Sequence, residues 1–87
     1  MTEVYTRDNC PYCDRAKALL TEKGIAYEEV PMTNEGVKAG LLKRVFDATA
    51  TEENPEGVIP KTVPQIFLEG HYIGGFDNLK AHFDAQP

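Results

Sequence analysis

Two cysteines lie three positions apart near the amino end of the chain, in Cys10-Pro11-Tyr12-Cys13, and the 87 residues contain no others. A disulfide between them closes a very small loop, so it restricts the unfolded chain little and would hardly stabilise the fold. Two thiols at this spacing can instead exchange a disulfide with each other and with a substrate. We therefore predict thiol–disulfide redox chemistry at Cys10 and Cys13.

The two thiols are expected to differ because a helix should begin between them. Pro11 suits the first position of a helix, where no backbone N–H is needed. Cys10 then occupies the N-cap, and the N–H of Tyr12 or Cys13 can donate to its sulfur. These donors and the helix dipole favour the thiolate, so the pKa of Cys10 is expected to fall. Cys13, more buried in the first turn, is predicted to resolve the mixed disulfide that the nucleophile Cys10 forms.

Short apolar runs predict strands at Val4–Thr6 and Ile25–Val30, on either side of a helix over Pro11–Lys23. Apolar residues of that helix recur at the spacing of one helical face, and Gly24 supplies a stop. A strand, a helix and a strand within about thirty residues form a βαβ unit with parallel strands.

The remaining elements are a helix over Asn34–Phe46, a polar loop from Ala48 to Lys61, and a hairpin of strands Gln65–Leu68 and His71–Gly74. A last helix covers Asp77–Asp84. This order predicts one α/β domain comprising all 87 residues, with a four-stranded mixed sheet flanked by three helices. The polar loop is most simply interpreted as a tolerated insertion.

The composition limits the classes of partner and compartment. The net charge of −5 argues against nucleic-acid binding, which needs clustered Lys and Arg. The amino end lacks the basic and apolar stretches of a signal peptide, and no apolar run reaches membrane-spanning length. We expect a cytoplasmic monomer that binds neither nucleic acid nor membrane, in a reducing setting where such a cysteine pair is catalytic, redox-active or metal-binding.

Other interpretations of the cysteine pair stay open at this point. A structural zinc site needs four ligands, and His71 and His82 lack metal-ligand spacing, so no metal site is expected. An iron–sulfur cluster shared by two chains is disfavoured because Pro11 stiffens the turn and the pair favours a disulfide. Two inert core thiols are disfavoured by the Pro-Tyr spacer at a helix start. Nothing in the sequence directly supports a role in binding alone.

Two residues near the pair have two interpretations each. Tyr12 could enter the core, but its place between two cysteines at a helix tip favours exposure beside the reactive sulfur. Pro64 could be an ordinary residue at the start of a strand or a cis proline in a tight bend.

Three motifs in the same order and spacing resemble those of glutaredoxins over nearly the whole chain. They are Cys10-Pro11-Tyr12-Cys13, Thr62-Val63-Pro64-Gln65-Ile66-Phe67 and Gly74-Gly75-Phe76-Asp77. The Pro-Tyr spacer and the absence of tryptophan speak against thioredoxin itself. The resemblance implies a thioredoxin-like fold, a cis Pro64 facing the cysteines, and glutathione as the reductant.

The resemblance also implies where glutathione binds. Its sulfur would bond to Cys10, and the backbone of Val63 would pair with the tripeptide like a strand. Its γ-glutamyl end would lie at the start of the last helix, where Asp77 suits the ammonium, and Arg7 could pair with the glycyl carboxylate. The implied contacts are Arg7, Tyr12, Thr62, Val63, Pro64, Gly75, Phe76 and Asp77.

The implied partners are glutathione and proteins with disulfides or bound glutathione, ribonucleotide reductase among them by family analogy. The loop from Ala48 to Lys61 is longer than in the most compact glutaredoxins and leads directly into Thr62, so it is expected to border the glutathione groove and alter partner choice. A compact chain with such an insert is similar to the glutaredoxins of bacteriophages.

Overall fold

The computed structural model describes residues 1–86 and contains one four-stranded mixed sheet with three helices. The sheet order is β2-β1-β3-β4, and the predicted α/β arrangement is confirmed. In chain order the elements are β1 (Glu3–Thr6), α1 (Pro11–Glu22), β2 (Glu28–Pro31), α2 (Glu35–Thr49), β3 (Gln65–Leu68), β4 (His71–Gly74) and α3 (Phe76–Asp84).

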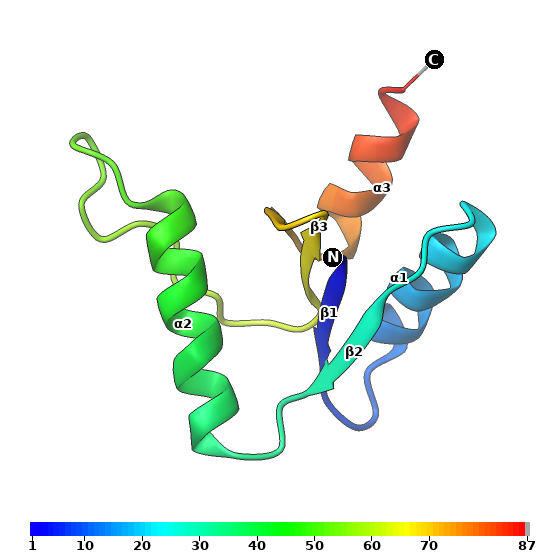
Figure 1. Cartoon of the computed structure of the whole chain (residues 1–87), viewed down its shortest axis with the longest axis horizontal. Coiled ribbons are helices and arrows are strands. Elements are labelled where there is room, and N and C mark those ends of the chain that lie inside the picture. Colours follow the sequence, from blue (N-terminus) through cyan, green and yellow to red (C-terminus); the bar gives the residue numbers. More distant parts are fainter. Residues whose placement is uncertain (87) are drawn as a thin grey trace.

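The strands pair in both directions. β1 is parallel to β2, with Glu3 opposite Glu28, so β1, α1 and β2 form the predicted βαβ unit. β3 is antiparallel to both β1 and β4, and β3 and β4 form the predicted hairpin. Helices α1 and α3 lie on one side of the sheet and α2 lies on the other (Figure 1).

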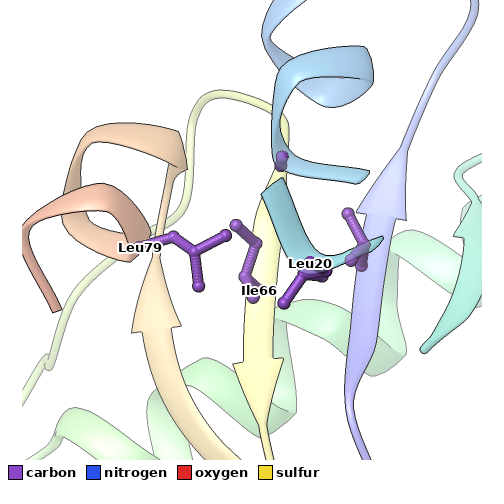
Figure 2. Close-up of a cluster of buried hydrophobic side chains, with 5 residues drawn as sticks. Leu20, Ile66 and Leu79 are labelled. Atoms are coloured by element: carbon purple, nitrogen blue, oxygen red, sulfur yellow. The ribbon is translucent and has the colours of Figure 1, made fainter. Parts of the chain in front are cut away.

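The core on the side of α1 and α3 is built from alternate strand residues. Val4 of β1 and Ile66 of β3 are fully buried against α1 and α3. Figure 2 shows Leu20 of α1 and Leu79 of α3 pointing toward Ile66 from their two helices. Neighbouring strand residues point to opposite sides of the sheet, so Val4 and Ile66 face the same helices. Their packing against α1 holds that helix, and with it the cysteine pair, on the sheet.

The opposite face holds α2. Tyr5 and Phe67, the neighbours of the residues just described, pack against Leu41 and Val45, which are the buried side chains of α2. Arg44 also ties α2 to the sheet, because its guanidinium lies 2.9 Å from a carboxylate oxygen of Glu3 and 3.9 Å from the centroid of the Phe67 ring.

Two predicted boundaries were wrong by several residues. β2 begins at Glu28 rather than Ile25, because the N–H of Ile25 donates to the carbonyl of Leu20 at the end of α1. α2 continues to Thr49, three residues beyond the predicted end, and the N–H of Ala50 still donates to the carbonyl of Phe46. The long loop therefore begins two residues later than expected.

Five other ends differ from the expectation by one residue. β1 begins at Glu3, α1 ends at Glu22, β2 ends at Pro31, α2 begins at Glu35 and α3 begins at Phe76. Within residues 1–86, no helix combines the length and the hydropathy that crossing a membrane requires.

Candidate active site

The two cysteines form a disulfide at the amino end of α1. Cys10 is the N-cap residue, with extended backbone, and Pro11 is the first residue of the helix. The sulfur of Cys10 accepts the N–H of Cys13 at 3.0 Å. The prediction that the first sulfur would accept a helix N–H is therefore confirmed. Such a donor also stabilises a thiolate when the disulfide is open.

Burial distinguishes the two sulfurs. Cys13 is 2% exposed and lies within the first turn of α1, whereas Cys10 is partly exposed. Tyr12, between them, is 53% exposed, so its interpretation as an exposed side chain is confirmed. Of the two cysteines, Cys10 is therefore the more accessible to a molecule that arrives from solvent.

The chain makes a tight connection from β1 to this helix. β1 ends at Thr6, and the turn that follows brings the chain to Cys10 within three residues. Asn9 in this turn has φ of 56°, a left-handed conformation that asparagine adopts more readily than most residues. This short turn therefore keeps Cys10 and the amino end of α1 close to the end of β1.

The segment before β3 lies beside the disulfide. The peptide bond between Val63 and Pro64 is cis, which settles the two interpretations of Pro64 and agrees with the implied geometry. The carbonyl oxygen of Val63 lies 3.8 Å from the sulfur of Cys10. The Val63–Pro64 segment is therefore in direct contact with the first cysteine, although more than fifty residues separate them.

A chain of hydrogen bonds holds this segment from beneath. Nε2 of the buried Gln65 donates to the carbonyl oxygen of Thr62 at 2.8 Å, and the hydroxyl of Tyr72 donates to Oε1 of Gln65 at 2.6 Å. Burial raises the pKa of Tyr72, so the hydroxyl remains protonated and able to donate. No motif in the sequence indicated this support, because Tyr72 lies on the next strand.

A groove of about 480 Å³ extends from Tyr12 and the cis peptide to the start of α3. We call it the redox groove. It brings together all the predicted contact residues except Arg7. Its lining consists of Tyr12, Thr62, Val63, Pro64, Gly75, Phe76, Asp77 and Asn78. Asn78 is the one lining residue that was not predicted, although its position next to Asp77 in the first turn of α3 indicates it.

The far end of the redox groove is the amino end of α3. Gly75 is the N-cap and has no side chain to cap the helix, so the first N–H groups of α3 have no side-chain partner of that kind. Such groups carry partial positive charge and suit an anion. Asp77 adds a carboxylate in the same turn, so one small ligand could meet donors and a negative charge together.

Arg7 lies in a second cavity of about 550 Å³ that shares Thr62 and Val63 with the redox groove. It therefore borders the groove from the side rather than lining it. His71 and His82, considered above as metal ligands, lie in β4 and α3. Residues 1–86 contain no group of three or more His, Cys, Asp and Glu side chains placed to hold a metal ion.

Comparison with known proteins gives a consistent result. The sequence model of the glutaredoxin family matches residues 2–73. Glutaredoxin 3 of Escherichia coli strain K12 is 40% identical over 79 residues, which cover 91% of this chain and 81% of that relative.

Solved structures agree with the sequence match. Glutaredoxin 1 from Francisella tularensis, complexed with cacodylate, has a TM-score of 0.71 at 32% identity and covers 95% of this chain and 91% of its own. A buckwheat glutaredoxin–glutathione complex has a TM-score of 0.65 at 26% identity, covering 95% and 68%. The thioredoxin-like fold expected from the resemblance is therefore confirmed.

Proposed function

This chain belongs to the glutaredoxin family and is a thiol–disulfide oxidoreductase, and we propose that glutathione is its reductant. The observation that carries the proposal is the redox groove, which runs from Tyr12 and the backbone of Val63, whose carbonyl oxygen lies 3.8 Å from the sulfur of Cys10, to the amino end of α3. A tripeptide needs a reactive sulfur, a strand-like backbone partner and sites for charged ends, and the groove and the cavity at its side offer each of these.

Each part of glutathione has a chemically matched place in this proposal. The cysteinyl sulfur bonds to Cys10, and the cysteinyl backbone pairs with that of Val63, as in strand addition. The γ-glutamyl carboxylate accepts from the first N–H groups of α3, near Phe76, and its ammonium faces Asp77. The rings of Tyr12 and Phe76, with centroids 6.1 Å apart, flank the same groove.

Two of the remaining predicted contacts, Thr62 and Arg7, lie where the glycyl end would leave the groove. Thr62 lines both the redox groove and the cavity that holds Arg7. A glycyl carboxylate extending past Thr62 would therefore meet the guanidinium of Arg7, which can form a charge-assisted pair with it. The buried Pro64 and the small Gly75 complete the floor of the groove without blocking it.

With a protein disulfide, both cysteines take part. The Cys10 thiolate attacks one sulfur of the substrate, the substrate disulfide breaks, and a mixed disulfide forms. The Cys13 thiolate then attacks the sulfur of Cys10, and the substrate leaves with two reduced sulfurs that take up protons from solvent. Two glutathione molecules reduce the resulting Cys10–Cys13 disulfide and leave as oxidised glutathione, so two electrons pass to the substrate.

With a glutathione mixed disulfide, Cys10 suffices. Its thiolate attacks the glutathionyl sulfur, and the substrate leaves as a thiolate that takes up a proton. A second glutathione thiolate attacks the sulfur now bound to Cys10 and releases oxidised glutathione. The Cys10 thiolate is regenerated, and Cys13 is not needed for this cycle.

The setting and partners are part of the proposal. We propose that the chain acts as a cytoplasmic monomer and reduces protein disulfides and glutathione mixed disulfides, ribonucleotide reductase being a candidate acceptor by family analogy alone. The net charge of −5 supports a protein partner over nucleic acid.

Glutathione-coupled reduction of the cysteamine–glutathione mixed disulfide tests the proposal. The wild type and Cys13→Ser should turn over, and Cys10→Ser should not. With a protein disulfide as substrate, both single variants should lose turnover. Activity that survives Cys10→Ser would contradict the assignment of the nucleophile. Turnover with thioredoxin reductase but not with glutathione would contradict the proposed reductant.

A further inference from the structure

Exposed apolar side chains gather at one place outside the redox groove. Six large apolar residues are exposed in residues 1–86, and four of them line a cavity of about 560 Å³ between α2 and the loop before β3. We call this cavity the apolar groove. Isolated apolar residues on a surface are normal, but a continuous patch indicates a binding surface. Its lining consists of Leu42, Lys43, Phe46, Glu56, Val58, Ile59 and Pro60.

The apolar groove is continuous with the redox groove. The cavity that holds Arg7, here called the bridging cavity, shares Leu42, Ile59 and Pro60 with the apolar groove. At its other end it shares Thr62 and Val63 with the redox groove. A single path therefore runs from the sulfur of Cys10 over the bridging cavity to the apolar groove.

The bridging cavity is positively charged within an acidic chain. It is lined by Arg7, Lys38 and Lys61, and none of the three has an ion pair or an aromatic partner among residues 1–86. The other six basic side chains each contact a carboxylate or an aromatic ring: Arg15, Lys17, Lys23, Lys43, Arg44 and Lys80.

The charges vary along the path. The three unpaired cations line the bridging cavity, between the redox groove and the apolar groove, whereas the basic residue of the apolar groove, Lys43, is already paired with Asp47 at 2.9 Å. Glu56 also lines the apolar groove, so anionic groups are less favoured there. A single glycyl carboxylate would neutralise one of the three cations and leave the rest of the path without a partner.

We propose that this path binds an extended segment of the protein substrate, with acidic residues next to the cysteine that Cys10 attacks and apolar residues beyond them. The acidic residues pair with the bridging cavity, and the apolar residues are buried by Phe46 and Ile59. The proposal deepens the proposed function, since it names the class of protein that the redox site serves, and it needs only the attack by Cys10. Because most affinity at such surfaces comes from a few buried apolar anchors, the apolar groove contributes most of the selectivity.

Peptide disulfides with defined flanking runs test the order and the sign of the charges. Each peptide contains Cys-Gly-Gly-Cys oxidised to a disulfide, flanked on one side by a run of Asp and then a run of Leu, by the same runs in reverse order, or by Lys and then Leu. Reduced protein is mixed with each peptide without glutathione, and the second-order rate constant is divided by that of dithiothreitol with the same peptide. The Asp-then-Leu peptide should react about ten-fold faster than the others, the factor that one good anchor gives.

Variants of the apolar groove locate the effect. Phe46→Ser and Ile59→Ser should reduce the preference for the Asp-then-Leu peptide over the reversed peptide, and Phe46→Leu should restore most of it. The preference over the Lys-then-Leu peptide should remain, because it depends on the bridging cavity. Ala39→Ser, an exposed position of α2 outside these cavities, should behave as the wild type. All four should reduce the cysteamine–glutathione mixed disulfide at the wild-type rate, which shows that the redox groove is intact.

The outcomes separate the two proposals. Equal normalised rates for the three kinds of peptide would overturn the docking path, whatever the protein does with glutathione. Failure to use glutathione, together with the peptide preference, would overturn the proposed reductant and leave the path in place. Sedimentation that shows a wild-type dimer abolished by Phe46→Ser would also overturn the path, because the groove would then hold a second copy of the chain.

Discussion

The hydroxyl of Tyr72 donates a hydrogen bond of 2.6 Å to Oε1 of Gln65, one strand away. Gln65 is buried, and its Nε2 donates to the carbonyl oxygen of Thr62, so the hydrogen bond from Tyr72 also helps to hold the Thr62 backbone. The side chain of a residue in β4 thus fixes the backbone that precedes the cis proline and forms one wall of the redox groove.

Tyr72→Phe should therefore affect both stability and substrate binding. Loss of the hydroxyl leaves the buried side-chain oxygen Oε1 of Gln65 without its donor. This loss should lower the free energy of unfolding, measured by urea titration, by about 1–2 kcal/mol. Because the wall at Thr62 loosens, KM for the cysteamine–glutathione mixed disulfide should rise while kcat changes little. An unchanged KM would show that Gln65 holds Thr62 without help from Tyr72.

The hydrogen bond from the N–H of Cys13 to the sulfur of Cys10 predicts that Cys10 is alkylated at lower pH than an ordinary thiol and faster than Cys13. In Cys13→Ser, whose backbone N–H is retained, iodoacetamide should react with Cys10 along a pH profile with a midpoint below that of an ordinary thiol. In Cys10→Ser, the buried Cys13 should react more slowly at every pH. Faster alkylation of Cys13 would contradict the proposed roles of the two thiols.

Arg7 borders the redox groove without lining it, so its removal should affect binding more than folding. Arg7→Ala should raise KM for the cysteamine–glutathione mixed disulfide roughly ten-fold, the loss expected for one charge-assisted pair. The midpoint of urea unfolding should stay within error, because Arg7 is exposed. Equal losses of binding and stability would instead make Arg7 a structural residue.

Glu29 gives the fold a pH dependence in the acid range. The hydrogen bond from the Thr6 hydroxyl, with help from the Lys17 ammonium and against partial burial, holds the pKa of Glu29 below its ordinary value of 4.5. A lowered folded-state pKa contributes stability above the unfolded value and loses it as the pH falls through the folded value. Wild-type stability should thus fall below about pH 4.5 more steeply than that of Glu29→Gln.

The effect should be less than about 1 kcal/mol, because the Glu29 side chain is 40% exposed to screening solvent. Glu28→Gln is the matched control, since Glu28 is an exposed neighbour on β2 with no side-chain hydrogen bond or ion pair among the described residues. Urea titrations at several pH values measure the slopes. Parallel slopes for the wild type and Glu29→Gln would contradict the prediction.

Two glycines should respond in opposite directions to alanine. Gly74 has φ of 113°, and an added Cβ would collide with the side chain of Asn78, so Gly74→Ala should cost about 1–3 kcal/mol or more. Gly40 lies in α2 with open space where a Cβ would be, so Gly40→Ala should stabilise the protein by about 0.5–1 kcal/mol. Thermal and urea unfolding measure both. A stable Gly74→Ala would mean that the start of α3 can shift.

The order of the elements was predictable because each contains its own signals. Pro11 and Gly24 mark the two ends of α1, and the continuous apolar run Ile66-Phe67-Leu68 marks a strand with two covered faces. Boundaries set by distant partners were not predictable. β2 begins where β1 offers it a partner, opposite Glu3, and the apolar Ile25 therefore stays outside the strand.

In the candidate site too, features set by the local sequence were predictable and features set by distant elements were not. The roles expected of Cys10 and Cys13 follow from their places at a helix start, which the local sequence contains. The convergence of Arg7, Lys38 and Lys61 on one cavity depends on how α2 and the loop before β3 pass the end of β1, and no sequence spacing reveals it. The same is true of the support that Tyr72 gives to Thr62.

The position of β2 at one edge of the sheet has a consequence for behaviour at high concentration. An edge strand exposes unpaired backbone groups to which another molecule could add a strand. Here the edge strand has four residues, carries the exposed carboxylates Glu28 and Glu29, and ends at Pro31, which has no N–H to donate. A second copy approaching this edge meets like charges and a missing donor, so the chain is protected against edge-to-edge aggregation along β2.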